Sequence, residues 1–170
     1  RNDFNSESHK QEKFGIDAYM KFKPGTHDWP RGQNGGYDTT LLRTCDDEDD
    51  KTLRLQHKPC YPLGNQAGLF CRHIGKSDGK DLNRNQLYTC YDKDDADLYV
   101  FHYHHKPTNT SHFWEIPSKA LAEHGYFTKT TGKESITLYG CPVAKQPDPN
   151  AYCQADTWTS AFYTGELKHA

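Results

Sequence analysis

The chain has 170 residues with 21 basic and 23 acidic side chains, and its aromatic residues (11 Tyr, 8 Phe, 3 Trp) outnumber its 12 Leu, 4 Ile and 2 Val. So many rings with a net charge of only −2 argue against intrinsic disorder, and no apolar run approaches the roughly 20 residues of a membrane span. The balanced charge argues against a protein that coats nucleic acid by charge alone. We expect a single domain over residues 1–170, with a core at about 7–140 and a C-terminal extension at 141–170.

The first expected element is a helix over residues 7–20, which Ser6 can cap. Its buried side is expected to carry Phe14, Ala18 and either Tyr19 or Met20. Gly15 lowers the helix propensity of this segment. Residues 24–36 are rich in Gly and Pro and are expected to form a loop.

A β-hairpin is the clearest local structure in the sequence. Residues 37–43 (YDTTLLR) and 52–58 (TLRLQHK) have the composition of strands, and the acidic run 46–50 between them forms the turn. Alternation in the second strand places Leu53, Leu55 and His57 on one face and Arg54, Gln56 and Lys58 on the other. The acidic run lacks the spacing and the glycine of an EF-hand, so we do not expect a calcium loop.

The rest of the chain adds strands and one short helix. Strands are expected at residues 68–74, 98–104, 113–116 and 135–139. A helix over 118–124 has Ser118 as its expected N-cap and Gly125 just after its end. This order predicts an α+β fold with a mixed central β-sheet flanked by helices.

The hairpin brings three polar side chains together. A turn centred near residues 47 and 48 pairs the strands so that Asp38 lies across from Gln56 or Lys58, on the same face of the sheet. A shift of the register by one residue would separate Asp38 from the other two. We therefore treat Asp38, Gln56 and Lys58 as a candidate site.

These residue types suit metal-dependent hydrolysis of a phosphodiester. Asp38 offers a charged oxygen and Gln56 a neutral one to Mg²⁺ or Mn²⁺, and water and a phosphate oxygen complete the shell. Lys58 can orient or help to deprotonate an attacking water, or stabilise charge in the transition state. Ordinary interpretations remain open, because Asp38 can belong to the preceding turn and Gln56 and Lys58 to the solvated face of an edge strand.

This hairpin resembles the PD-(D/E)xK nuclease superfamily, which includes restriction endonucleases and Holliday-junction resolvases. The matching pieces are Gly36-Tyr37-Asp38 and Leu55-Gln56-His57-Lys58. The Gln-x-Lys form is similar to a subset in which Gln replaces the second acid, and the proline before the first Asp is absent. The resemblance covers about residues 7–127 and implies a restriction-endonuclease-like core.

The resemblance also implies an activity, a cofactor and partners. The implied activity is a Mg²⁺- or Mn²⁺-dependent endonuclease acting on nucleic acid, with DNA as the expected substrate and a homodimer as the expected assembly. Members of the superfamily often complete the metal site with a glutamate on a helix before the first strand. Glu12 matches that role best, and Glu7 is the second choice.

Histidines offer a rival site. His102 and His104 alternate on one strand, and His105 and His112 lie nearby in the sequence. Two imidazoles on one face can hold zinc if a third ligand joins them. The simpler interpretation is that these histidines stack and form hydrogen bonds without a metal. A local basic face is also possible from Arg31, Arg43, Arg54, Lys58 and Arg72.

Two further interpretations remain open. The chain can be a catalytically inactive nuclease-fold domain that binds nucleic acid or protein, or a secreted binding protein held by disulfides. The six cysteines are Cys45, Cys60, Cys71, Cys90, Cys141 and Cys153. They contain no CxxC pair, and their even number permits disulfides. We favour an intracellular over a secreted location.

Overall fold

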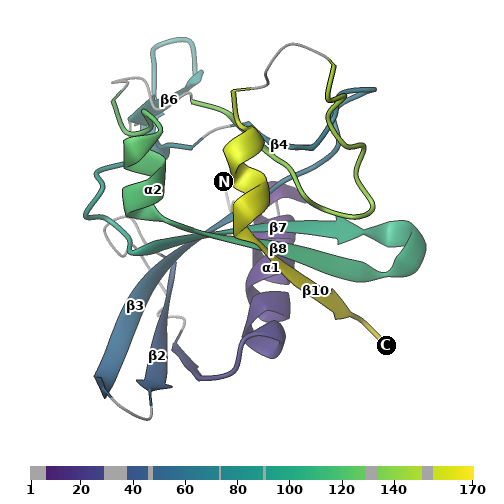
Figure 1. Cartoon of the computed structure of the whole chain (residues 1–170). Helices are drawn as coiled ribbons and strands as arrows, with labels where there is room; N and C mark the ends of the chain where they lie inside the picture. The colour runs from purple at the N-terminus through teal and green to yellow at the C-terminus, as the bar shows by residue number, and fades with distance from the viewer. Residues whose placement is uncertain are drawn as a thin grey trace.

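A six-stranded mixed β-sheet forms the centre of the structure. The structure is a computed structural model that describes residues 7–28, 38–45, 48–72, 74–89, 91–128, 134–150 and 155–170. The strands of the sheet, in spatial order, are β1 (Thr26–Asp28), β2 (Thr39–Cys45), β3 (Glu48–Pro59), β7 (Leu98–His105), β8 (Thr110–Pro117) and β10 (Tyr163–Lys168) (Figure 1). β3 and β7 pair in parallel, and the other neighbours pair antiparallel. Because a parallel pair needs a crossover, the chain leaves the sheet between β3 and β7.

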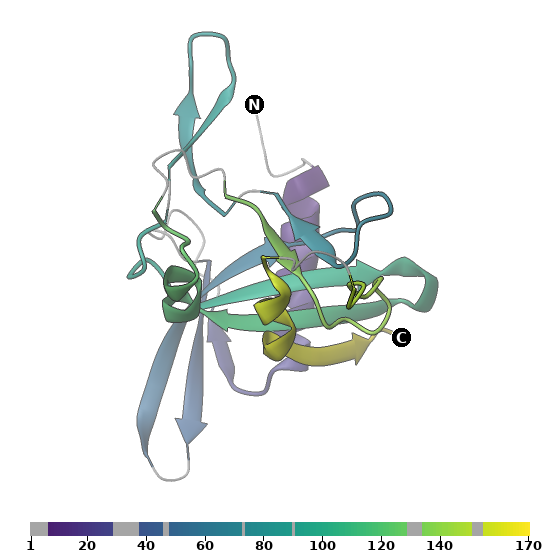
Figure 2. The ribbon, with the colours of Figure 1, turned by 45° about the horizontal axis from the view of Figure 1, so that its top comes forward.

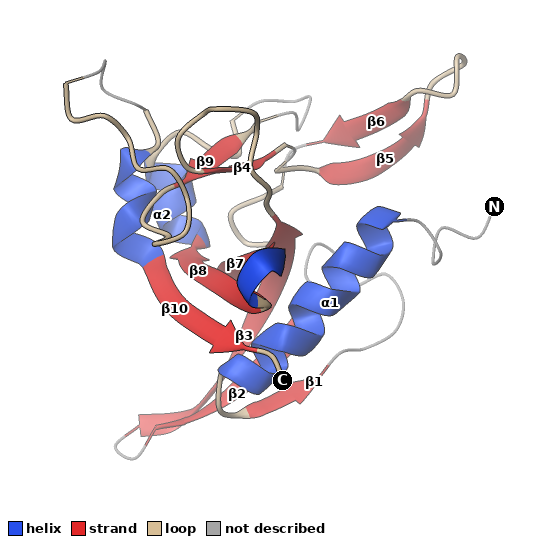
Figure 3. Ribbon diagram, turned by 90° about the vertical axis from the view of Figure 1, so that its right-hand side faces the viewer, coloured by secondary structure: helices blue, strands red, loops and turns tan. Residues whose placement is uncertain are grey.

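Helix α1 (Glu7–Phe22) covers one face of this sheet (Figure 3). The core on this face contains Ala18, Tyr19, Leu41, Leu55, Leu98, Val100 and Phe113. Its strand residues stand at alternate positions, because every second side chain of a strand points to the same face. Leu53 and His57 face the helix together with Leu55, as predicted, and the centroid of the His57 ring lies 5.5 Å from that of Tyr19.

The opposite face carries the larger core. It is covered by α2 (Ser118–Glu123), by a two-stranded sheet of β4 (Leu69–Cys71) and β9 (Ile136–Leu138), and by the 3-10 helix η3 (Thr157–Phe162). Tyr99 and Phe101 of β7 point into this core beside Trp114 of β8. The Trp114 indole Nε1 donates a hydrogen bond to the carbonyl oxygen of Tyr139 at 2.7 Å. Aromatic rings therefore make up much of the core, as the composition predicts.

The crossover between β3 and β7 includes a second hairpin. β5 (Lys76–Lys80) and β6 (Gln86–Thr89) pair antiparallel and project from the rest of the fold (Figure 2). Leu82, between these two strands, is fully exposed. The 3-10 helix η2 (Lys106–Thr108) connects β7 to β8. None of the described helices is long and apolar enough to cross a membrane.

The structure confirms the α+β class and the mixed sheet flanked by helices. It also adds strands that the sequence does not predict. β1 lies in the expected loop 24–36, and β5 and β6 lie in a polar segment without alternation. β10, near the C-terminus, pairs with β8 as an edge strand of the central sheet. The expected cap of the first helix, Ser6, lies outside the described residues.

Two local predictions are wrong. Phe14 was expected on the buried side of α1 but is 38% exposed. The buried side runs instead through Gly15, where an added Cβ would lie 3.0 Å from Nδ1 of His102, so any larger residue would push against this imidazole. Ser118 is the first residue of α2 rather than its N-cap, because Pro117 occupies the cap position and no side chain caps the helix.

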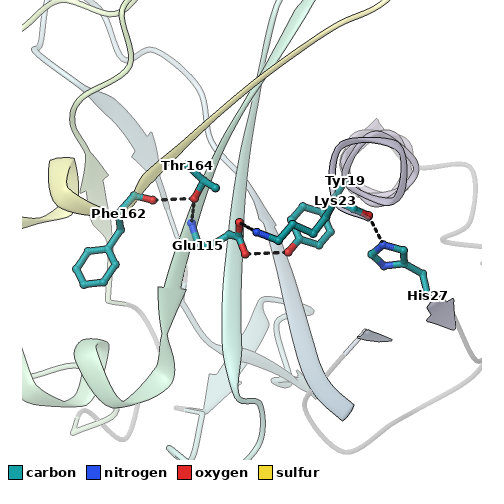
Figure 4. A network of polar contacts seen from close by, with 6 residues as sticks. All are labelled: Tyr19, Lys23, His27, Glu115, Phe162 and Thr164. Carbon is teal, nitrogen blue, oxygen red and sulfur yellow. Dashed lines mark hydrogen bonds and ion pairs between the residues drawn. The ribbon is translucent and has the colours of Figure 1, made fainter. Parts of the chain in front are cut away.

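A polar network fastens α1 to the sheet (Figure 4). The hydroxyl of Tyr19 donates to Oε2 of Glu115 at 3.0 Å, and Nζ of Lys23 donates to Oε1 of the same carboxylate at 2.9 Å. The side chain of Glu115 is 10% exposed. Its backbone N–H donates to Oγ1 of Thr164 at 3.1 Å, which extends the network to β10.

We expect Glu115→Ala to destabilise the protein by about 2 kcal/mol, because it leaves a buried tyrosine hydroxyl and a partly buried ammonium without their acceptor. Glu115→Gln should cost less, since its amide oxygen can still accept one of the two bonds. Glu123→Ala is the control, because Glu123 is exposed at the end of α2. Urea unfolding gives the free energies, and equal values for Glu115→Ala and the control would contradict the prediction.

Candidate active site

Asp38 precedes β2 and is fixed by two backbone contacts to β3. Its N–H donates to the carbonyl oxygen of Leu55 at 2.7 Å, and its Oδ2 accepts from the N–H of His57 at 2.9 Å. Thr39 pairs with Leu55 in the sheet, so Asp38 stands next to Gln56 at the continuation of that register. This is one of the two registers that the sequence predicts.

Lys58 lies on the face of β3 opposite to α1. Its Nζ donates to the hydroxyl of Tyr91 at 2.9 Å and lies 4.9 Å from the centroid of the Tyr91 ring. Gln56 shares this face and is 6% exposed. None of the hydrogen bonds between described residues joins the Gln56 amide to the carboxyl groups of Asp38 or Glu12.

Glu12 reaches the hairpin from α1, and its carboxyl forms a hydrogen bond with that of Asp38. Burial and the nearby Glu12 charge raise the pKa of Asp38 to about 7, although the His57 N–H and the Lys58 charge oppose the shift. Burial also raises the pKa of Glu12, against the effects of Lys58 and Asp38. Two close carboxyl groups cannot both ionise freely, so the pair retains a proton near neutral pH.

Lys58 remains protonated in this environment. Burial by itself lowers the pKa of its ammonium, but Tyr91, Cys71 and Asp38 raise it, and the net direction is upward. The site therefore combines two carboxyl groups that hold less than their full negative charge with one fixed positive charge. Glu12, Asp38 and Lys58 come together in space, and Gln56, in the same strand as Lys58, occupies the register position opposite Asp38.

The oxygen donors fit a hard divalent cation. Glu12 and Asp38 supply two carboxylates, and Mg²⁺ is commonly held by one or two carboxylates while it keeps several waters. In the described part of the chain, no group of three His, Cys, Asp or Glu side chains could hold a metal ion, so an all-protein cage of that kind is not built there. The second candidate ligand, Glu7, begins α1, and its side chain lies outside the described residues.

Tyr91 is a site residue that sequence reasoning missed. It is 5% exposed, it follows β6, and it contacts Lys58 across 33 residues of the chain. The segment around Tyr91 has no hydrophobic periodicity, so no local sequence signal distinguishes Tyr91 from the other tyrosines as a site residue. The contact depends on the crossover that returns the chain over the sheet.

We expect Tyr91→Phe to lower the pKa of Lys58, because Tyr91 is the main group that raises it. The change removes the hydroxyl acceptor but keeps the ring face beside the ammonium. Tyr99→Phe is the matched control, since no described residue bonds the buried Tyr99 hydroxyl. Carbon-13 NMR of the lysine Cε during a pH titration measures the shift, and an unchanged Lys58 midpoint in Tyr91→Phe would contradict the assignment.

The histidines are engaged by protein groups. Nε2 of His102 lies 2.8 Å from Oγ of Ser111, and Nε2 of His104 lies 2.9 Å from Oδ1 of Asn109. His105 bonds Thr108 and His112 bonds Tyr163 through their Nδ1 atoms, each at 2.8 Å. These bonds favour the interpretation without a metal over the zinc site.

Three of the six cysteines, Cys60, Cys71 and Cys141, are buried and are not part of a disulfide. This counts against a disulfide role for half of the cysteines. Of the proposed basic face, Arg54 pairs with the carboxylate of Asp97 at 3.2 Å, and Arg72 is exposed. Arg31 and the side chain of Arg43 lie outside the described residues.

Comparison with known proteins gives a structural match without a sequence match. No family model and no curated protein matches the chain. A bacterial homing endonuclease, I-Ssp6803I, is similar in structure, with a TM-score of 0.58 and 15% identity over 85% of this chain and 86% of that chain. MepB matches with a TM-score of 0.45 and 18% identity over 91% of this chain and 94% of its own. The first similarity shows that this chain shares the overall fold of that endonuclease.

Proposed function

We propose that this chain is a metal-dependent nuclease of the PD-(D/E)xK type, in its Gln-x-Lys form, that hydrolyses phosphodiester bonds of DNA. The observation that carries the proposal is the convergence of Glu12 and Asp38 beside the fixed ammonium of Lys58. The fold shared with a homing endonuclease supports it. The homodimer implied by the resemblance is part of the proposal, since two copies would cut two strands.

Each residue has a role in this reaction. Asp38 and Glu12 would hold Mg²⁺ or Mn²⁺ with carboxylate oxygens, and Gln56 would offer a neutral oxygen. The cation supplies Lewis acidity and lowers the pKa of bound water when it is present. Lys58 keeps its proton in the metal-free site, which suits a role in orienting the phosphate and stabilising its developing charge rather than in taking a proton.

A cleavage assay tests the proposal. The full chain is incubated with plasmid, branched-junction and single-stranded DNA, with Mg²⁺, with Mn²⁺, or with EDTA. We expect cleavage of at least one substrate that needs the cation and that Asp38→Asn abolishes. Asp17→Asn is the matched control, because Asp17 is an exposed residue of α1. Cleavage that survives EDTA, or that Asp38→Asn retains in full, would overturn the proposal.

A binding module without catalysis is the second candidate function. It is favoured by Gln56, which leaves the second strand of the hairpin without a carboxylate at this position. This function predicts that DNA binding is measurable in EDTA and that no cation brings about cleavage. A fluorescence anisotropy titration beside the cleavage assay separates the two functions.

A further inference from the structure

A cavity of about 560 Å³ lies on the α1 side of the central sheet. Its walls come from the N-terminal half of α1, from the segment that follows β3, and from the end of β7 with the η2 turn. Figure 2 shows α1 and the loop after β3 side by side. Pockets of roughly 300–1,000 Å³ bind small molecules in proteins, so the volume is enough for one nucleotide.

The cavity exposes aromatic rings in fixed positions. Phe14 is 38% exposed, and its ring centroid lies 4.7 Å from that of His104 and 5.7 Å from that of His102. Hydrogen bonds to Asn109 and Ser111 hold these two imidazoles in place. Flat side chains that cannot rotate away offer a preformed surface on which another ring can stack.

The charge of the cavity wall has one sign. Lys10 and Lys106 line it, and no Asp or Glu is among its described lining residues. The wall therefore favours a ligand that combines a flat ring with a negative charge.

The cavity also adjoins the site through the chain itself. Gln11, next to Glu12 in α1, lines the cavity, and so does Pro59, which follows Lys58 in β3. Two separate elements thus carry a site residue and a cavity residue side by side. Because consecutive strand residues point to opposite faces, Pro59 faces the α1 side and Lys58 faces away from it, so a DNA strand that reaches both has to pass the end of β3.

We propose that this cavity binds one unpaired nucleotide of a DNA strand, with the base against Phe14 and His104 and the phosphate toward Lys10 and Lys106. The inference deepens the proposed function and rests on it for the nature of the ligand. The base must be unpaired, because both faces of a base inside a duplex are already stacked on its neighbours and are not open to a side-chain ring.

The test is a titration of the metal-free full chain in EDTA, followed by NMR of the histidine ring protons. The probes are deoxyadenosine monophosphate, deoxyadenosine and inorganic phosphate. We expect the monophosphate to bind with a Kd on the order of 1 mM or tighter, at least tenfold more tightly than either of the other probes, and to shift the His102 and His104 signals. Equal binding of deoxyadenosine and its monophosphate would overturn the role of the lysines.

Substitutions locate the binding. Phe14→Leu keeps apolar bulk but removes the ring, and it should weaken binding about tenfold. Phe14→Ala should do the same or more. Lys10→Gln should weaken binding severalfold, whereas Lys13→Gln, an exposed lysine of the same helix, should not. Lys106→Gln has Lys119→Gln on α2 as its control. Wild-type affinity in both Phe14 variants would overturn the proposal.

Oligonucleotides distinguish a strand from a free nucleotide. A single-stranded oligonucleotide should displace the monophosphate, and a blunt duplex of the same sequence should not. Failure of the single strand to displace it would show a site for free nucleotides and overturn the proposal. Cleavage is assayed separately. Mg²⁺-dependent cleavage without nucleotide binding would contradict only the proposal that the cavity binds a nucleotide. Nucleotide binding without cleavage would contradict only the proposed nuclease activity.

Discussion

Lys58→Met is expected to lower the rate of Mg²⁺-dependent DNA cleavage by at least about a hundredfold without unfolding the protein. The Lys58 ammonium is held by the Tyr91 hydroxyl and the Tyr91 ring, and its pKa is raised, so it carries its charge throughout the neutral range. Methionine has a similar length and an unbranched stem, so the substitution removes the charge and preserves most of the packing. Single-turnover cleavage under saturating DNA measures the effect on the chemical step.

The controls separate catalysis from metal binding. Lys80→Met alters an exposed lysine in β5 and should cleave at the wild-type rate. The affinity of Lys58→Met for Mn²⁺, measured by calorimetry, should stay the same or increase, because a positive charge near the two carboxyl groups is lost. A Lys58→Met protein that cleaves at the wild-type rate would show that Lys58 has no part in the reaction. A variant that loses Mn²⁺ binding and cleavage together would show that Lys58 acts only on the metal site.

The hairpin was predictable because its information is local. β2 and β3 follow each other directly, with only residues 46 and 47 between them in the sequence, so few pairing registers are possible. Period-2 alternation then decides that Gln56 and Lys58 share one face while Leu55 and His57 share the other. Three of the four candidate residues belong to this hairpin, so sequence alone could place Asp38 near the β3 residues.

The other parts of the site depend on long-range structure. Tyr91 meets Lys58 only because the crossover folds back over the sheet, and a polar segment gives no periodic signal for that path. The prediction for α1 is correct for Ala18 and Tyr19, which are buried, and wrong for Phe14 alone, for a related reason. The helix turns Gly15 toward the buried His102 ring and leaves Phe14 at the cavity, whereas a hydrophobic pattern alone would bury the phenylalanine.

The metal-free protein should lose stability as the pH rises from about 4 to about 7, because Asp38 must ionise inside its partly buried site. The pKa of Asp38 is about 7 in the folded protein, whereas its ordinary value, which applies to the unfolded chain, is 3.8. At a pH between 3.8 and 7, the unfolded chain therefore releases this proton more readily than the folded protein does. Unfolding therefore becomes more favourable with increasing pH, and the loss is complete above about pH 7. One pKa unit corresponds to about 1.4 kcal/mol. The expected loss is on the order of 2–4 kcal/mol, or roughly 5–10 °C in Tm.

Asp38→Asn tests this linkage, because asparagine is neutral at every pH and its side-chain oxygen can still accept the His57 N–H. In thermal unfolding in EDTA at pH 5, 6, 7 and 8, the Tm of Asp38→Asn should exceed that of the wild type by an amount that grows up to pH 7. Asp17→Asn should follow the wild type. If Glu12 and Asp38 hold a cation, Mg²⁺ should raise the wild-type Tm more at pH 8 than at pH 6, because the cation competes with the shared proton. A constant difference in Tm between Asp38→Asn and the wild type would mean that Asp38 is already ionised in the folded protein at pH 5.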